Sequence, residues 1–313
     1  MPVVNAPAAP FVVEFGRPGT AVTPRSRGFG LGLAIPVLVG DSREVIFPQP
    51  AARLENPGLD LVTSGDLLLG CVSEAVTDEA GFAAQAQALY QRVLAAVRGR
   101  HLYRIWNYVP RINGLAAGFE NYRAFCQGRS LAFEAESGAG FPGVLPSASA
   151  VGTRDGFLSV VFVGGSIGPR HFENPEQVPA YRYPAEHGPR PPSFSRATVA
   201  VLPGRTLTFI SGTAAIKGHE SVAPHSFEAQ LDCTLDNLHL ISKTAGLGEN
   251  LGANRGAQRH FKVYLRHPDD LAATRARLEH SLFQPADHVI YLQADICRAE
   301  LNVEVEVSII GHE

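Results

Sequence analysis

The sequence predicts an α+β fold built from two related units, each a mixed β-sheet with helices packed on one face. Two observations carry this prediction. Elements in the order β-β-α-β-α-β occur twice along the 313 residues. The last predicted strand, residues 301–310, alternates strictly, with apolar residues at the odd positions and polar ones, including Glu304 and Glu306, at the even positions. Such a strand needs a cover over its apolar face.

The first unit contains one clear amphipathic helix and several strand candidates. The helix stripe is Phe82, Ala86, Leu89, Val93 and Val97. We expect short strands near 11–15, 29–37 and 43–48, a strand or hairpin over 59–74, a helix over about 78–98, a strand over 101–109, a helix around 118–134, a Gly/Pro/Ser loop, and a strand over 157–165.

The second unit follows the same order. Its longest helix has a core stripe of Phe227, Leu231, Leu235, Leu238 and Ile241. We expect strands over 197–202 and 206–211, a helix over about 225–245, a strand over 260–265, a helix over about 268–283, and strands over 288–294 and 301–310. This organisation predicts domains at 1–165 and 166–313, the second beginning with a Pro-rich connection over 168–196.

The composition excludes several classes of function. A formal net charge of −3 removes a general electrostatic case for binding nucleic acid or a membrane surface. The four cysteines form no CxxC motif or Cys/His cluster, which disfavours a zinc site and indicates reduced thiols. The first residues lack the pattern of a signal peptide, and no apolar run reaches membrane-spanning length. We therefore expect a cytoplasmic protein.

The connection over 168–196 is rich in groups that bind carboxylates. It contains Arg170, Arg182, Arg190, Arg196, Tyr181, Tyr183, His171 and His187. Guanidinium groups match carboxylates in a bidentate geometry, so this segment is suited to a small carboxylated ligand. The alternative is a solvated connection whose arginines pair with nearby acids.

Two further segments are weaker candidates for ligand contacts. Tyr122 and Arg129 lie seven residues apart on a predicted helix and so share a face, although ordinary surface residues of an amphipathic helix look the same. Ser211, Gly212 and Thr213 end a predicted strand, where backbone N–H groups and a hydroxyl suit an oxyanion. The alternative for the second segment is a β-bulge or strand corner.

The terminal strand carries the candidate acid. Glu304 and Glu306 share a strand face, and a nearby like charge with partial burial raises a carboxyl pKa, as a general acid requires. The alternative is a pair of exposed glutamates on an edge strand. Cys297 has no neighbouring base, so the residues favour a packed thiol over a nucleophile.

The second half resembles the reactive-intermediate deaminase (Rid, or YjgF) superfamily. The similarity rests on FISGTAAIKGHES, VYLRHPDDL and the terminal VEVEVSII. It implies Rid-like (chorismate mutase-like) units, with a degenerate one in the first half, and ligand clefts between sheets. Small Rid deaminases carry an arginine where this chain has Asp287, which argues against simple imine deaminase activity.

A longer set of motifs resembles the chorismatases, which remove the enolpyruvyl group of chorismate as pyruvate. The motifs are YRIWNYVPRIN, ENYRAFCQGRSLAF, AYRYP and GPRPPSFSRA, together with the Rid-like half. The resemblance implies that Glu304 is the catalytic acid and that Cys297 marks the subtype forming an aromatic hydroxybenzoate. The products would be pyruvate and 3-hydroxybenzoate, alone or with 4-hydroxybenzoate.

The same resemblance implies a ligand set. Tyr122 and Arg129 would hold one carboxylate of chorismate, Tyr183 and Arg196 the other, and Gly212 and Thr213 would contact its polar end. No metal or organic cofactor is needed, and the protein would be a monomer or a homotrimer. A Rid-like protein that binds small carboxylates, or an imine deaminase, is the alternative.

Overall fold

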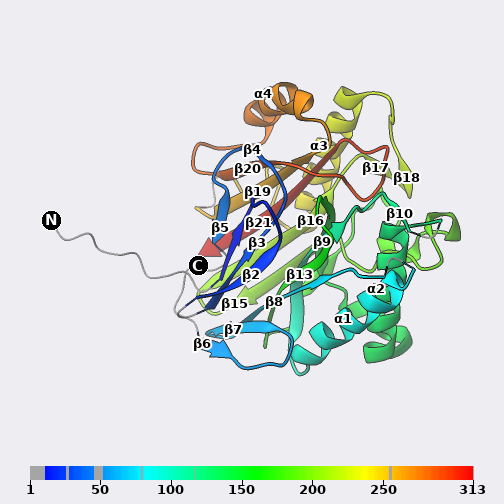
Figure 1. The fold of residues 1–313 in the computed structure, drawn as a ribbon. Helices are drawn as coiled ribbons and strands as arrows, with labels where there is room; N and C mark the ends of the chain where they lie inside the picture. The colour runs from blue at the N-terminus through cyan, green and yellow to red at the C-terminus, as the bar shows by residue number, and fades with distance from the viewer. Residues whose placement is uncertain are drawn as a thin grey trace.

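The computed structural model describes residues 11–25, 28–45, 52–78, 80–116, 118–253 and 256–312 (Figure 1). Over these residues the chain forms two large mixed sheets and four α-helices, which confirms the predicted α+β class. In Figure 1, α3 and α4 lie at the top and α1 and α2 at the lower right, with the sheets between the two pairs.

The first large sheet has the strand order β12-β9-β13-β8-β7-β6. Its strands are β6 (Ala52–Leu54), β7 (Asp60–Ser64), β8 (Leu67–Ala75), β9 (His101–Pro110), β12 (Ser147–Thr153) and β13 (Phe157–Gly165). Strands β9 and β12 run parallel, and the other neighbours run antiparallel. Helices α1 (Phe82–Ala96) and α2 (Asn121–Ser137) follow β8 and β9, with a short hairpin of β10 (Leu115–Ala116) and β11 (Phe119–Glu120) before α2.

The second large sheet has the order β14-β15-β16-β21-β19-β20-β4. Its strands are β4 (Val37–Val39), β14 (Arg170–Phe172), β15 (Ala197–Leu202), β16 (Arg205–Thr213), β19 (Gln258–Leu265), β20 (His288–Gln293) and β21 (Val303–His312). Strands β19 and β20 run parallel. Helices α3 (Phe227–Thr244) and α4 (Leu271–Ser281) follow the β16 segment and β19, and a small hairpin of β17 (Ile216–Lys217) and β18 (Glu220–Ser221) precedes α3.

The two sheets repeat one topology. The first unit runs β7-β8-α1-β9-α2-β12-β13 along the chain, and the second runs β15-β16-α3-β19-α4-β20-β21. In each, the last strand lies centrally, antiparallel to the second strand on one side and to the strand after the first helix on the other. The predicted relation between the two halves is therefore confirmed.

The helices cover the outer face of each sheet. The predicted stripes of α1 and α3 are buried in separate cores, one beneath α1 and α2 and one beneath α3 and α4. The inner faces of the two sheets contribute to a third core, in which Tyr103 and Trp106 of β9 pack with Phe209 of β16 and Tyr264 of β19. Side chains on these inner faces therefore lie between the two units.

Strand β12 joins the units at a seam. Its segment was expected to be a Gly/Pro/Ser loop, because small residues hide the strand pattern, and that expectation is wrong. The backbone N–H groups of Ser147 and Ala148 donate to Thr198 Oγ1 and Ser211 Oγ of the second unit, each at 2.8 Å. The small side chains allow β12 to lie against β16.

The N-terminal segment forms a small sheet of order β2-β3-β1-β5. Its strands are β1 (Phe11–Glu14), β2 (Ala21–Arg25), β3 (Gly28–Gly32) and β5 (Arg43–Val45). The strand expected near 29–37 is divided between β3 and β4, and residues 46–48 of another lie outside the described residues. Because β4 pairs with β20 of the second sheet, the domain division at residue 165 stays a prediction.

Smaller differences affect element ends. The helix expected over 268–283 is a 3₁₀ turn, η4 (Pro268–Asp270), followed by α4, and the last strand begins at Val303 rather than 301. Three further 3₁₀ turns are η1 (Gly138–Val144), η2 (Ala180–Arg182) and η3 (Ala185–His187). Helix α3 begins after Ser226, whose Oγ accepts from the Ala229 N–H at 3.3 Å and caps the helix.

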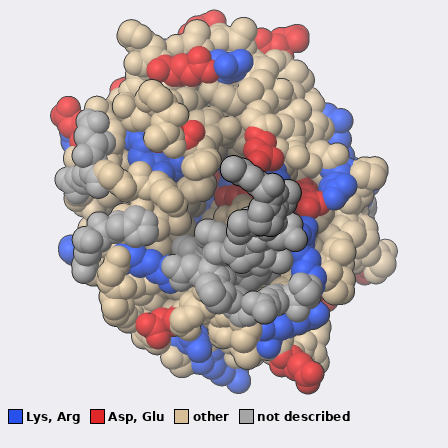
Figure 2. Space-filling model, turned by 90° about the vertical axis from the view of Figure 1, so that its left-hand side faces the viewer, with Lys and Arg blue, Asp and Glu red and all other residues tan. Residues whose placement is uncertain are grey.

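The exterior drawn in Figure 2 carries charges of both signs. Across the described ranges, no helix has the length and apolarity needed to cross a membrane. On the face drawn in Figure 2, basic side chains form separate groups with acidic ones among them, rather than one continuous basic surface.

Candidate active site

A cavity opens at the seam between the two units. The start of α2, the connection and the second unit all supply its wall. The lining residues are Glu120, Tyr122, Arg123, Tyr183, His187, Pro192, Phe194, Arg196, Gly212, Ala214, Ile216, Cys297, Arg298, Ala299, Glu300 and Glu304. Segments far apart in the sequence therefore meet at one concave surface.

Six of the eight residues predicted from the sequence line this cavity: Tyr122, Tyr183, Arg196, Gly212, Cys297 and Glu304. Arg129 and Thr213 are not among the lining residues. The Arg129 guanidinium is buried, 5.2 Å from the centre of the Tyr90 ring. Thr213 donates through Oγ1 to the Ser211 carbonyl at 2.8 Å. Direct contact of these two with a ligand stays a prediction.

Strand β21 holds both glutamates inside the molecule. Its odd positions, from Val303 to Ile309, pack in the core beneath α3 and α4, as the alternation predicted. Glu304 and Glu306 point to the inner face and are only 3% and 2% exposed. The alternative of exposed glutamates on an edge strand is wrong, because β21 lies between β16 and β19.

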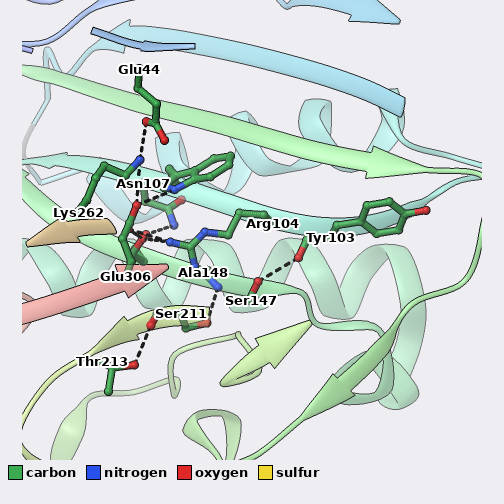
Figure 3. A network of polar contacts seen from close by, with 12 residues as sticks. Glu44, Tyr103, Arg104, Asn107, Ser147, Ala148, Ser211, Thr213, Lys262 and Glu306 are labelled. Atoms are coloured by element: carbon green, nitrogen blue, oxygen red, sulfur yellow. Dashed lines mark hydrogen bonds and ion pairs between the residues drawn. The ribbon is translucent and has the colours of Figure 1, made fainter. Parts of the chain in front are cut away.

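Glu306 is held as a carboxylate by a buried network, drawn in Figure 3. Its Oε2 accepts from Arg104 Nη2 at 2.8 Å, and its Oε1 accepts from Trp106 Nε1 at 2.8 Å and pairs with Lys262 Nζ at 2.9 Å. Ser149 Oγ also donates to Oε2. Burial alone would raise the pKa of Glu306, but the charges of Lys262 and Arg104 lower it below its ordinary value.

The network extends to the N-terminal sheet. Lys262 Nζ also donates to Glu44 Oε2 of β5 at 2.7 Å (Figure 3). Burial lowers the pKa of Lys262, but Glu306 and Glu44 together raise it above the ordinary value. The network therefore has no net charge without Glu304. Two of its members are positive, Lys262 and Arg104, and two are negative, Glu44 and Glu306.

Glu304 is a protonated acid at neutral pH. Burial, followed by the negative charge of Glu306, raises the pKa of Glu304 to about 8. Its Oε1 is buried and has no hydrogen-bond partner among the described residues. A buried carboxylate without partners is costly, so Glu304 stays neutral and keeps a proton at the cavity wall.

Gly212 makes room for this acid. A Cβ built on Gly212 would come within 2.0 Å of Glu304 Oε1 and 3.1 Å of Ser149 Cβ. The β16–β21 register shifts between Ile210 and Thr213, so the segment is also the bulge that the alternative interpretation predicted. The glycine is needed because the Glu304 carboxyl occupies the space of a side chain.

One arginine of the connection, Arg196, is held at the cavity wall by a hydrogen bond. Arg196 Nη2 donates to Tyr183 Oη at 2.7 Å, while Arg196 Nε is buried without a hydrogen-bond partner among the described residues. Arg190 instead pairs with Glu134 at 2.8 Å, as expected for a solvated connection. Arg196 also lies near an acid, with its Nε 4.0 Å from Glu173 Oε2, and it is the arginine of this connection that lines the cavity, so its contact with a ligand stays a prediction.

Sequence reasoning missed Arg298. This residue lines the cavity, its guanidinium lies 5.4 Å from the centre of the Tyr183 ring, and its Nη1 donates to Ser221 Oγ at 3.0 Å. Its Nη2 is buried without a hydrogen-bond partner in the described part of the chain. Its position next to Cys297 was the available signal.

Cys297 and Tyr122 are neutral wall residues. Burial, followed by the charge of Glu304, raises the pKa of the Cys297 thiol to about 12. Burial also raises the pKa of Tyr122 well above its ordinary value. A protonated thiol is a poor nucleophile, so the burial of Cys297 favours a packed thiol over a nucleophile.

Comparisons with known proteins identify the family of this chain. Residues 46–164 match a family model described as "Chorismatase FkbO/Hyg5-like, N-terminal". The chain is 38% identical over 219 residues to a 3-hydroxybenzoate synthase of Streptomyces hygroscopicus, a match that covers 66% of this chain and 62% of the relative, less than two thirds of its length.

Two other matches cover a larger share of both aligned chains. A chorismatase of Streptomyces rapamycinicus is 35% identical over 268 residues, covering 82% of this chain and 78% of the relative. A crystal structure of a chorismatase at 1.08 Å resolution superposes with a TM-score of 0.83 at 29% identity, covering 99% of this chain and 95% of that one. The chain belongs to the chorismatase family.

Proposed function

We propose that this protein is an enzyme that converts chorismate to pyruvate and 3-hydroxybenzoate, alone or with 4-hydroxybenzoate. The observation that carries the proposal is the buried, protonated Glu304 at the wall of a cavity that also presents arginine side chains. An acid in this state suits proton transfer to carbon. The names of the relatives support the same reaction.

Chorismate is a dianion, and the cavity wall presents arginine side chains for it, among them Arg196 and Arg298. We assign one carboxylate to Arg196 and Tyr183, which already share a hydrogen bond. We assign the other carboxylate to Tyr122 and Arg298, and Arg298 supplies the positive charge on that part of the cavity wall. The predicted partner Arg129 would act from behind that wall. Burial raises the pKa of Cys126 to about 12, and the hydrogen bond with Tyr122 and the charge of Arg129 oppose that rise. Gly212 and Thr213 stay assigned to the polar end of the ligand.

The chemical step begins at the enol ether. Glu304 donates its proton to the methylene carbon, which becomes a methyl group and leaves an oxocarbenium ion. Water adds to the oxocarbenium carbon, the one bonded to the ether oxygen, and gives a proton to the Glu304 carboxylate. The resulting hemiketal breaks its bond to the ring oxygen, releasing pyruvate and a ring diol. The diol loses water and becomes aromatic, so water is consumed once and released once, and no metal or organic cofactor is needed.

We assign product choice to Cys297. The resemblance to chorismatases links cysteine at this position with an aromatic product and alanine with a dihydroxycyclohexadienoate. Its side chain lines the same cavity as Glu304, so it can position the ring as the diol loses water. In Cys297→Ala we expect the product mixture to shift from hydroxybenzoate towards the diene diol. An unchanged product mixture would remove this role.

The test is product analysis. The full-length protein is incubated with chorismate, pyruvate is followed by a coupled lactate dehydrogenase assay, and the aromatic products are separated by chromatography. We expect equimolar pyruvate and hydroxybenzoate. Folded protein that releases no pyruvate would contradict the proposal, and calorimetric binding of chorismate without turnover would support a Rid-like binding protein instead.

The imine deaminase alternative has little support. Asp287, which replaces the arginine of small Rid deaminases, forms a buried ion pair with Arg259, with Oδ1 accepting from Nε at 2.8 Å. We further propose a cytoplasmic location, where the four free cysteines stay reduced. One chain supplies both units of the site, so a monomer and a homotrimer would each carry it, and light scattering distinguishes them.

A further inference from the structure

Four potential metal ligands converge at the edge of the cavity. Glu186 and His187 come from the turn η3 in the connection, and His219 and Glu220 come from the β17–β18 hairpin. One nitrogen or oxygen from each residue lies within 4.8 Å of the others. Gly218 in the hairpin turn has φ 57°, in the left-handed region, and the next residue, His219, has its Nδ1 3.0 Å from Nε2 of His187 in η3.

The spacing of these atoms matches a small coordination shell. His187 Nε2 lies 3.0 Å from His219 Nδ1 and 3.6 Å from Glu186 Oε1. His219 Nδ1 lies 3.4 Å from Glu186 Oε1 and 3.1 Å from Glu220 Oε1. With metal–ligand bonds of about 2.0–2.1 Å, neighbouring ligands of a tetrahedral zinc ion lie about 3.3 Å apart. The four distances fall on either side of that value.

The charges also suit a divalent cation. Two carboxylates supply two negative charges, and imidazole and carboxylate are ligands that Zn²⁺ accepts. The nearby Lys217 is directed to Glu176, with which it forms an ion pair. Arg298 is held by Ser221 Oγ, to which its Nη1 donates at 3.0 Å, and it is not one of the four ligand residues.

A simpler interpretation is a hydrogen bond between the two histidine rings with glutamates beside them. It explains the 3.0 Å contact between His187 and His219. It does not explain why Glu186 Oε1 lies close to both ring nitrogens at once. A cation bound by Glu186, His187 and His219 would require these three side chains to converge on one point, as they do.

We propose that Glu186, His187, His219 and Glu220 form a binding site for a divalent transition-metal ion of the Zn²⁺ type. The ion ties the connection to the β17–β18 hairpin. Because His187 and Ile216 line the cavity, the ion fixes two parts of its wall. The cysteine pattern could not reveal this site, since it contains no cysteine and His187 and His219 are 32 residues apart.

The test is calorimetric titration of the chelator-treated full chain with Zn²⁺. We expect one ion per chain, and Co²⁺ should give the strong visible absorption of a four-coordinate site. Loss of an outer-shell partner already weakens metal binding about 10–100-fold, so the double variant His187→Ala/His219→Ala should weaken it by at least that much. Glu186→Gln/Glu220→Gln should act in the same direction.

The matched control is His280→Ala, an exposed histidine on α4, which should leave Zn²⁺ binding unchanged. A second measurement needs no variant: Zn²⁺ should slow hydrogen exchange in both 185–188 and 216–221 of the native chain. Absence of stoichiometric binding, equal affinity in the double histidine variant, or unchanged exchange in these segments would each overturn the proposal.

Discussion

The two units share a topology but differ at the strand that lies centrally in each sheet. In the first unit, β13 presents Val161 and Val163 to the interior between the sheets. In the second, β21 presents Glu304 and Glu306 to the same interior. The same position in the fold is thus apolar packing in one unit and a pair of carboxylates in the other.

The difference teaches that the site depends on both units. The second unit supplies the acids and Lys262, but Arg104 and Trp106, which also hold Glu306, belong to β9 of the first unit. Burial and the charge of Glu306 raise the pKa of Glu304, whose Oε1 has no hydrogen-bond partner among the described residues. The cations of both units contact Glu306 instead and lower its pKa. The following predictions test this division, from the largest expected effect to the smallest.

Replacing Glu304, the acid whose pKa is raised, should remove turnover. In Glu304→Gln the side chain keeps its shape but has no proton to give to carbon, so we expect kcat to fall about 10²–10⁴-fold with little change in stability. Pyruvate release and thermal unfolding measure the two effects. The matched control is Glu300→Gln at the same cavity, where Oε1 accepts from Ser221 Oγ at 2.7 Å, and it should keep most of the activity. An active Glu304→Gln enzyme would show that another group is the acid.

Replacing Glu306, the carboxylate that contacts the buried cations, should instead destabilise the fold. Glu306→Gln leaves Arg104 and Lys262 buried without the carboxylate between them, which costs about 3–5 kcal/mol of unfolding free energy. Urea denaturation measures this cost. Glu74→Gln is the control, since its ion pair with Arg92 is about one-third exposed and should contribute less than about 1 kcal/mol. Similar losses in both variants would contradict a buried network centred on Glu306.

The sequence predicted what depends on local pattern. The alternation of β21 and the stripes of α1 and α3 gave the correct faces, since periodicity records which side of an element is buried. Periodicity did not predict β12, because the residues of this strand are small where it packs closely against β16. The proposed division of roles between Glu304 and Glu306 came from the resemblance to a family, and the contacts that shift their pKa values in opposite directions involve other strands.

The partners of Glu306 were beyond sequence reasoning for a physical reason. Arg104 and Glu306 are 202 residues apart, and Glu44 and Lys262 are 218 apart, so only the packing of the sheets brings them together. Arg129 illustrates the opposite case. Its helical spacing from Tyr122 was visible, but its guanidinium lies over the Tyr90 and Phe133 rings rather than at the cavity wall.

The pH dependence of turnover should report the protonation of Glu304. The proton donor is active when protonated, and burial and the charge of Glu306 raise its pKa to about 8. Activity should therefore be constant below that pH and fall about tenfold per pH unit above it. The measurement is kcat/KM from about pH 6 to about pH 10 at constant ionic strength. A rate that rises through pH 8 would identify the group as a base.

The smallest effect should come from Glu44, whose contact with the network among the described residues is its ion pair with Lys262. Glu44→Gln removes one negative charge, so the remaining cluster becomes more positive and stabilises the Glu304 carboxylate. The pKa of Glu304 should fall, and the alkaline loss of activity should begin at lower pH by less than about one unit. Glu14→Gln is the matched control in the same small sheet, because Glu14 pairs with Arg17 and Arg25 instead. An equal shift in both variants would mean that the net charge of the protein, rather than the chain of contacts through Lys262, sets the pKa of Glu304.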